Sequence, residues 1–158
     1  MPGLIVDDLG PVTRLTLDRP AKLNAMDQPV LDALAQALDR IEASSETLAV
    51  LVTATGGRAF SAGADIAAWG ALEPLDMWRR WIVPGNRLFE RLTRLRQPTV
   101  AAIDGIAYGG GLELALACDI RIASERSRMA LPETGIGTVP GWGGARRLVV
   151  AIGWPRAK

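Results

Sequence analysis

Two carboxylates stand apart from every other charged residue in this sequence. Glu113 is the only charged residue in the stretch 105–118, and Glu133 is the only one in the stretch 129–145. The residues around Glu113, Leu112–Ala117, are otherwise leucine and alanine, so this carboxyl group is expected to be buried with a raised pKa. Two carboxyl groups held on apolar walls can divide the roles of general acid and general base.

Each glutamate could instead have a structural role, hydrogen-bonded to backbone groups or paired with an arginine distant in the sequence. Both, however, lie beside glycine-rich backbone, with Gly109–Gly111 before Glu113 and Gly135–Gly137 after Glu133. Glycine lets backbone groups approach a ligand closely, which favours the functional interpretation. We therefore take both as candidate catalytic residues that the fold must bring together.

A short helix is expected to open at Gly109–Gly111, because the chain is apolar from there through Cys118 except for Glu113. The first N–H groups of a helix lack intrahelical acceptors and can stabilise an anion or oxyanion. The alternative is a tight, closely packed turn. The small residues Ser61–Ala64 form a second candidate for accessible N–H groups. A P-loop is excluded because no Gly-Lys-Ser/Thr follows, and a dinucleotide fingerprint because Pro140 replaces its third glycine.

The composition excludes several classes of function. The chain has 158 residues, 49% of them hydrophobic, and a net charge of +1, so we expect one soluble domain that binds neither nucleic acid nor membrane. The absence of histidine excludes imidazole bases and the commonest metal ligands, and no metal is expected. The one cysteine, Cys118, is expected in the core, in a reducing compartment. The first ten residues do not resemble a signal peptide, which favours a cytoplasmic location.

Strands and helices alternate along the chain, which places it in the α/β class. Val12–Leu17 alternates polar and apolar residues and predicts a half-buried strand, whereas the apolar run Thr47–Thr55 predicts a strand covered on both faces. Between them, Asp27 offers an N-cap to a helix with apolar residues at helical spacing up to Ile41. Further helices are expected within 74–96, with an interruption at 84–85, and over 109–118. Another helix ends at 153, and a new element starts at 155. Further strands are expected over 98–103, 120–123 and 129–131.

Four segments resemble, in order, the motifs of the enoyl-CoA hydratase/isomerase (crotonase) family. They are Leu17–Met26, Ala59–Ile66, Gly105–Ala115 and Leu131–Gly144. The resemblance implies an α/β fold, a crotonase-like spiral of repeated ββα units, with residues 1–158 as the N-terminal core domain. Members of the family continue for about another hundred residues, a domain-sized piece that covers the pocket and forms trimers. We therefore expect the C-terminal helical trimerisation region to be absent from this chain.

The resemblance also implies the chemistry of the site. The substrate is an acyl-CoA thioester whose carbonyl oxygen lies between the N–H groups of Ala64 and Gly110, and no cofactor is needed because CoA is part of the substrate. Glu113 acts as the base on a water molecule, and Glu133 supplies the proton at the α carbon of a 2-trans-enoyl-CoA. A full-length protein is expected to form a homotrimer or a dimer of trimers. Contacts with the substrate and its CoA group are expected at Lys22, Leu23, Ala25, Ala62, Gly63, Asp65, Ile66 and Gly109.

The presence of both glutamates favours a hydratase over other branches of the family. Isomerases often keep one glutamate in a different place, so an isomerase or another acyl-CoA enzyme of the family stays open as an alternative. The dehalogenase-like branch needs a histidine, which this chain lacks. A non-catalytic acyl-CoA-binding fragment is the third interpretation, supported by the short length of the chain.

Overall fold

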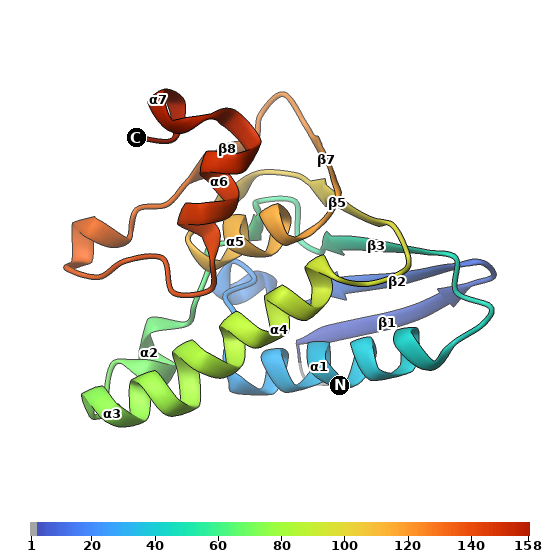
Figure 1. Ribbon diagram of the computed structural model, residues 1–158, viewed down its shortest axis with the longest axis horizontal. Coiled ribbons are helices and arrows are strands. Elements are labelled where there is room, and N and C mark those ends of the chain that lie inside the picture. Colours follow the sequence, from blue (N-terminus) through green and yellow to red (C-terminus); the bar gives the residue numbers. More distant parts are fainter. Residues whose placement is uncertain (1–2) are drawn as a thin grey trace.

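Two β-sheets form the framework of the computed structural model, which describes residues 3–158 (Figure 1). The strands of the first sheet lie in the order β1-β2-β3-β5-β7, and those of the second in the order β4-β6-β8. β1 pairs antiparallel with β2, whereas the other pairs in both sheets are parallel. The strands are β1 Leu4–Leu9, β2 Val12–Leu17, β3 Ala49–Ala54, β4 Ala59–Ser61, β5 Thr99–Ile103, β6 Ile106–Tyr108, β7 Ile120–Ala123 and β8 Arg128–Ala130.

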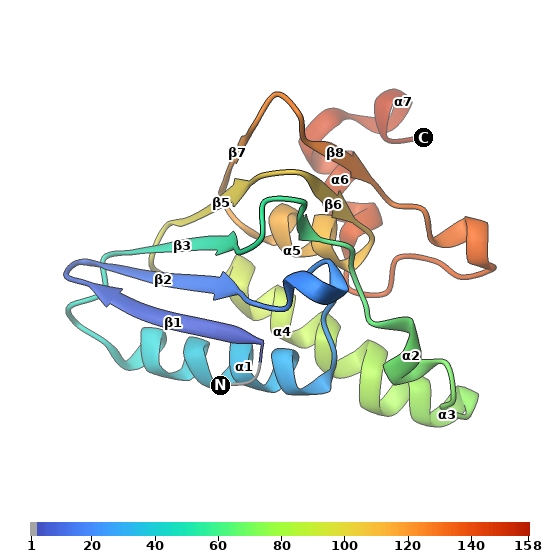
Figure 2. The ribbon, with the colours of Figure 1, turned by 180° about the vertical axis from the view of Figure 1, so that it is seen from behind.

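From β3 onward the chain repeats one unit, a strand in the first sheet, a strand in the second and then a helix (Figure 2). β3 and β4 lead to α4, β5 and β6 lead to α5, and β7 and β8 lead to α6. This spiral of ββα units confirms the predicted fold class. The helices are η1 Pro20–Lys22, α1 Gln28–Ala43, α2 Ile66–Trp69, α3 Pro74–Asp76, η2 Met77–Ile82, α4 Val83–Thr93, α5 Gly110–Ala117, η3 Glu133–Ile136, α6 Gly144–Ile152 and α7 Trp154–Ala157.

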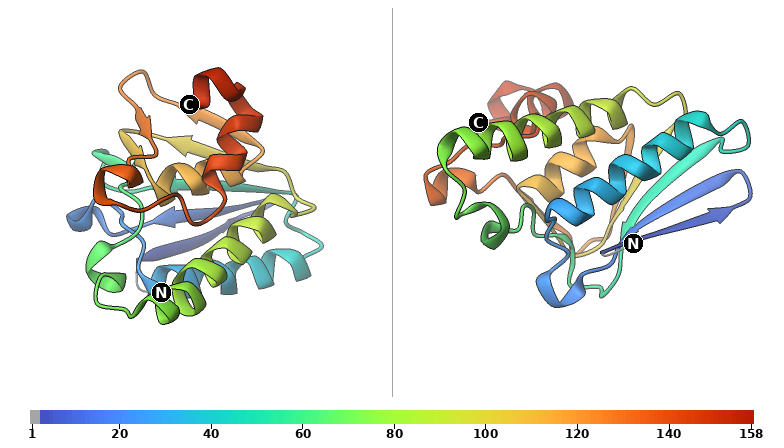
Figure 3. Two further views of the ribbon diagram at one scale, coloured as in Figure 1. Left: turned by 60° about the vertical axis from the view of Figure 1, so that its left-hand side comes forward. Right: turned by 90° about the horizontal axis from the view of Figure 1, so that it is seen from below.

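Helix α1 begins where its capping residue predicts. The Asp27 carboxylate accepts the Val30 N–H at 3.1 Å, and Pro29 occupies the first turn, where its missing N–H costs nothing. α1 packs against β1, β2 and α4, and α4 packs in turn against α5, so that the three helices lie side by side (Figure 3). The buried face of α1 consists of Val30, Leu31, Ala33, Leu34, Ala37, Leu38 and Ile41.

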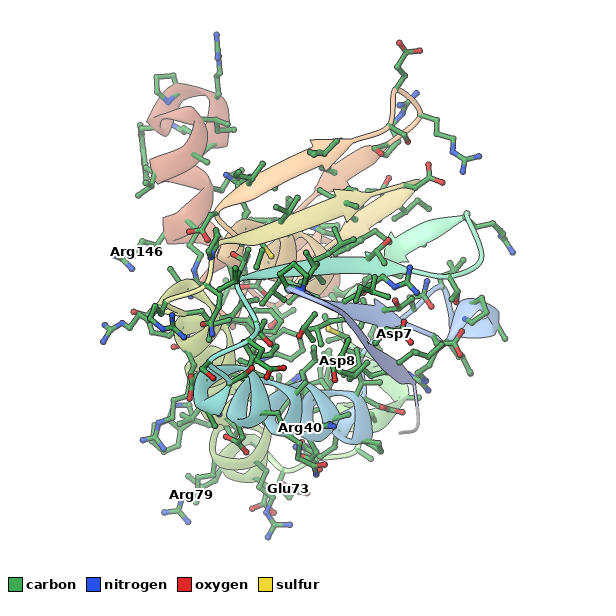
Figure 4. All side chains as sticks on the ribbon, turned by 90° about the vertical axis from the view of Figure 1, so that its right-hand side faces the viewer. Asp7, Asp8, Arg40, Glu73, Arg79 and Arg146 are labelled. Carbon is green, nitrogen blue, oxygen red and sulfur yellow. The ribbon has the colours of Figure 1, made fainter. Side chains whose placement is uncertain are left out.

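Helix α5 lies inside the molecule. Every residue from Gly110 to Ala117 is buried, which confirms the prediction from a sequence without a polar face. Cys118 follows it in the core, and burial raises the pKa of its thiol to about 12. Charged side chains such as Glu73, Arg79 and Arg146 lie at the outer surface instead (Figure 4). No helix within residues 3–158 is long and apolar enough to cross a bilayer.

The structure departs from the expected elements in the short strands. β4 and β6 have three residues each, too few for alternation to be read from the sequence. In β1, Asp7 and Asp8 interrupt the apolar pattern, and Asp7 pairs with Arg14 of β2 at 2.9 Å. β3 is buried at Val50 and Val52, but its other face is only partly covered.

The expected interruption of the helix at Pro84-Gly85 does not occur. The chain stays helical from α3 through α4, and the residues before the proline form the wider π-helical turn η2. The Val83 N–H bonds to the Trp78 carbonyl, five residues back. Because Pro84 has no N–H to donate, the helix changes its hydrogen-bond register there instead of ending. Gly85 lies directly against the indole of Trp142, where a larger residue would overlap with the ring.

Candidate active site

Helix α5 places Glu113 in the core with its carboxylate turned toward the loop before α6. The side chain is 2% exposed, and Oε1 accepts the N–H groups of Trp142 and Gly144, each at 2.8 Å. Burial raises the pKa of Glu113, the two N–H groups partly oppose that shift, and the negative charge of Glu133 raises the pKa further. Burial and the two backbone donors therefore act on the pKa of Glu113 in opposite directions, and burial has the larger effect.

Glu133 begins the single turn η3, which is separated from the end of β8 by two residues. Its Oε2 is buried and has no hydrogen-bond partner among residues 3–158, and burial raises the pKa of this carboxyl group. Its Oε1 lies 3.1 Å from the position that a Cβ would occupy on Gly109, whose φ is +50°. Glycine at 109 therefore leaves the room into which the Glu133 carboxyl group fits.

One cavity of about 210 Å³ brings the two glutamates together. The wall includes the polar residues Glu113, Glu133 and Thr138, and the small residues Ala64, Gly109 and Gly110. Apolar side chains form most of the remaining wall, namely Ala62, Ile66, Trp69, Met77, Trp81, Ile82, Ile136, Val139 and Trp142.

The backbone N–H groups of Ala64 and Gly110 are among those of this wall that have no acceptor within residues 3–158. Met26 donates to the Gly63 carbonyl at 2.7 Å and accepts from the Asp65 N–H at 2.8 Å, a parallel bridge that turns the Ala64 N–H away from Met26. Gly110 is the first residue of α5, so its N–H has no intrahelical acceptor.

The two donors belong to segments in close contact. The Ala64 nitrogen lies 3.4 Å from the Cβ position of Gly110, and the Gly110 nitrogen lies 3.0 Å from the Cβ position of Gly63. Gly63 has a φ of +101°, and a Cβ on it would stand 2.7 Å from the Tyr108 carbonyl. The close packing that the sequence offered as the alternative interpretation is therefore present, and it brings the segments of the two N–H groups together. Such a pair can stabilise a developing oxyanion.

The other residues predicted to contact substrate lie around this wall. Ala62, Ile66 and Gly109 line the cavity, and Gly63 is buried behind it. Lys22 is the exposed last residue of η1, and Leu23 and Ala25 lie in the loop that follows it. Asp65 is not part of the cavity wall; its carboxylate caps α2 and pairs with Arg19 at 3.1 Å. Contact of these residues with CoA stays a prediction.

Trp142 is the main residue of the wall that sequence reasoning missed. Its indole packs against Trp81 and Phe89, with ring centroids 5.5 Å and 5.1 Å away, and stands 2.5 Å from the Cβ position of Gly110. Of the three tryptophans at helical spacing, Trp69 and Trp81 line the cavity, whereas Trp78 is 56% exposed. The signal available for Trp142 was its place among glycines, after Gly141 and before Gly143 and Gly144.

The burial of Glu113 has a consequence for stability. Because its pKa is raised in the folded protein, the folded state binds a proton more readily than the unfolded chain does, and stability falls as the pH rises above the unfolded pKa of about 4.3. Glu113→Gln keeps an oxygen for the Trp142 and Gly144 donors and never ionises. We expect this variant to be more stable than wild type at neutral pH, with the difference shrinking as the pH approaches 4. Urea unfolding at both pH values measures it, and a difference that grows on acidification would contradict the assignment.

No group of three or more acidic or cysteine side chains within residues 3–158 is placed to hold a metal ion. The chemistry that these residues can perform consists of proton transfer by two carboxyl groups beside a pair of N–H donors.

Comparisons with known proteins all lead to one family. The family model described as enoyl-CoA hydratase/isomerase matches residues 9–158. A short-chain-enoyl-CoA hydratase of Clostridium acetobutylicum is 41% identical over 156 residues, which is 99% of this chain and 59% of that protein. A mitochondrial enoyl-CoA hydratase of Pongo abelii is 40% identical over 139 residues, covering 88% and 47%.

The solved structures agree as well. The crystal structure of an enoyl-CoA hydratase from Bacillus anthracis superposes with a TM-score of 0.94 at 37% identity, over 99% of this chain and 60% of that one. An enoyl-CoA hydratase from Thermoplasma volcanium gives 0.91 at 32% identity, over 99% and 62%. The chain thus spans about three fifths of the length of these structures.

Proposed function

This chain belongs to the enoyl-CoA hydratase/isomerase family, and from that we propose that its protein adds water across the double bond of a 2-trans-enoyl-CoA thioester. The observation that carries the proposal is one cavity shared by two carboxyl groups and two N–H donors without acceptors. The reaction needs no cofactor, because CoA arrives as part of the substrate.

The thioester carbonyl oxygen accepts hydrogen bonds from the Ala64 and Gly110 N–H groups. When water attacks the β carbon, the electrons of the double bond move toward that oxygen and form an enolate. Donors fixed in advance stabilise this charge without reorganisation, and one such donor contributes about 3–4 kcal/mol in comparable sites. The two N–H groups lack acceptors among residues 3–158 and are therefore available to the substrate.

The surroundings of the two glutamates support a division of roles. The Glu113 carboxylate is stabilised by the Trp142 and Gly144 N–H groups, so it can accept a proton from the attacking water. Glu133 has a buried oxygen without a donor, which favours its neutral, protonated form. It transfers that proton to the α carbon as the enolate collapses. Water thus supplies the β hydroxyl group and one proton, and exchange with solvent restores the two carboxyl groups.

Binding and assembly follow from family membership as further parts of the proposal. The CoA group runs past Lys22, Leu23 and Ala25 and along 62–66, with the acyl chain directed to the aromatic end of the cavity at Trp81 and Trp142. We expect the full-length protein to be cytoplasmic and to assemble as a homotrimer or a dimer of trimers; sedimentation equilibrium measures the assembly.

Two substrates test the proposed function. We expect the purified protein to abolish the conjugated-thioester absorbance of a short 2-enoyl-CoA and to release a 3-hydroxyacyl-CoA, identified by mass spectrometry. A 3-enoyl-CoA serves as the matched substrate for an isomerase. Conversion of the 3-enoyl-CoA without hydration of the 2-enoyl-CoA would favour isomerisation, and tight binding of both without turnover would favour a binding protein.

A further inference from the structure

Arg19 joins the two segments that frame the cavity. One guanidinium nitrogen lies 3.0 Å from an Asp27 oxygen and 3.1 Å from an Asp65 oxygen, and another donates to the Ala25 carbonyl. The side chains of Arg19, Asp27 and Asp65 are 22%, 21% and 15% exposed, so this cluster is mostly shielded from water. Arg19 thereby contacts both the predicted CoA loop and the segment that contains Ala64.

Each of the two aspartates bonds both to Arg19 and to the start of a helix. Asp27 uses one carboxylate oxygen for the Val30 N–H of α1, and Asp65 uses one for the Ala67 N–H of α2, at 3.1 Å and 3.2 Å. The second oxygen of each aspartate goes to Arg19. A planar guanidinium can serve both carboxylates at once, which a lysine ammonium does less well. One side chain therefore ties together the starts of two helices.

Backbone bonds connect this cluster to the Ala64 donor. The Ala62 N–H donates to the Leu23 carbonyl at 2.9 Å, and the Met26 bridge described above brackets Ala64 on both sides. A shift of the loop 22–26 relative to 62–65 therefore moves or rotates the Ala64 N–H. The opposing donor, Gly110, belongs to α5 and would stay in place.

Asn24 fixes the other side of the same loop. It has a φ of +54° and is 2% exposed, and its side-chain amide donates to the carbonyls of Thr55 and Ala59 while accepting the Arg19 N–H at 2.8 Å. A non-glycine residue in this conformation persists only where its surroundings hold it. The loop is thus held from both ends, by the Asn24 amide and by the Arg19 guanidinium.

We propose that Arg19 is a positioning residue, which through Asp27 and Asp65 holds the Ala64 N–H in register with the Gly110 N–H. The role of these N–H groups rests on the proposed function, whereas the placement of Arg19 rests on the contacts above. A misplacement of about 1 Å in such a site costs about a hundredfold in rate.

A matched control exists on the other side of the molecule. Arg91 also pairs with two acids, Asp39 at 2.6 Å and Glu42 at 2.8 Å, but it joins α4 to α1 and does not line the cavity. We expect Arg19→Met to lower kcat by about tenfold to a hundredfold, Arg19→Lys to recover part of that loss, and Arg91→Met to leave kcat unchanged. The melting temperatures of Arg19→Met and Arg91→Met are expected to fall by similar amounts.

A second measurement needs no turnover. Butyryl-CoA is saturated and cannot be hydrated, but its thioester carbonyl still accepts hydrogen bonds, which lower its infrared stretching frequency. We expect this lowering when butyryl-CoA binds to wild type and Arg91→Met, less of it in Arg19→Lys and least in Arg19→Met. If wild type lowers the frequency but hydrates no enoyl-CoA, the proposed function fails while the role of Arg19 stands.

Equal frequencies and equal kcat values in the Arg19 and Arg91 variants would overturn the positioning role. If Arg19→Met does not fold, Arg19→Lys tests the proposal instead. A folded lysine variant with wild-type kcat and carbonyl frequency would also overturn the positioning role of Arg19.

Discussion

Glu113→Gln and Glu133→Gln are each expected to lower kcat for hydration of a short 2-enoyl-CoA by about 10²–10⁴-fold. Glutamine keeps the shape of each side chain and, at 113, an oxygen for the Trp142 and Gly144 donors. It can neither take a proton from water nor return one to the α carbon. Because the ground-state contacts survive, we expect KM to change far less than kcat, which steady-state kinetics at several substrate concentrations measures.

The two glutamates act in one reaction, so the double variant is expected to lose much less than the product of the two single losses. Glu73→Gln is the matched control, because Glu73 is an exposed glutamate on the surface away from the cavity and its loss removes the same charge. Wild-type kcat in either Glu113→Gln or Glu133→Gln would exclude that residue from the chemistry. A large rise in KM alone would assign it to substrate binding instead.

Gly63→Ala has the second large effect, because it acts on both N–H donors without removing either. The added methyl group would stand 2.7 Å from the Tyr108 carbonyl and 3.0 Å from the Gly110 nitrogen, so the segments of Ala64 and Gly110 must separate. Loss of one oxyanion donor costs about 10²–10³-fold in kcat, and we expect a loss of this order. Stopped-flow measurement of the conjugated absorbance gives the rate.

Gly10→Ala separates this steric effect from backbone strain. Gly10 also has a positive φ, +67°, but nothing lies within 4 Å of its Cβ position. A positive φ costs a non-glycine residue about 1–2 kcal/mol, so both variants are expected to lose stability. Only Gly63→Ala is expected to lose activity. Equal kcat values in the two variants would show that the spacing of the two segments does not matter for catalysis.

The two candidate carboxyl groups could be recognised in the sequence because each lies in a stretch without any other charged residue. The stretch 110–117 has no polar face, so the burial of Glu113 follows from the sequence pattern alone. Asp27 likewise predicts the start of α1, because its residue type and position are those of an N-cap. The partners of Glu113 could not be predicted. They are backbone N–H groups of Trp142 and Gly144, and a backbone donor has no residue type by which it can be recognised.

The arrangement around Ala64 could not be predicted from the sequence for a similar reason. β4 and β6 have only three residues each, and the bridge between Met26 and Ala64 joins segments almost forty positions apart. Arg19 resembles any other arginine of a polar turn until its two aspartate partners are seen together. Trp142 was missed because its indole fits against Gly85 and Gly110, which leave room for it by having no side chain. These two glycines are far apart in the sequence, so their contact with the same ring is visible only in the structure.

The most direct test of the central claim follows the oxygen atom. A short 2-enoyl-CoA is incubated with the purified protein in isotopically labelled water, and the product is analysed by mass spectrometry. The account predicts a 3-hydroxyacyl-CoA with one labelled oxygen on the β carbon, formed by wild type and at a greatly reduced rate by the double variant Glu113→Gln, Glu133→Gln. Unchanged thioester, or labelled product formed equally fast by the double variant, would contradict it.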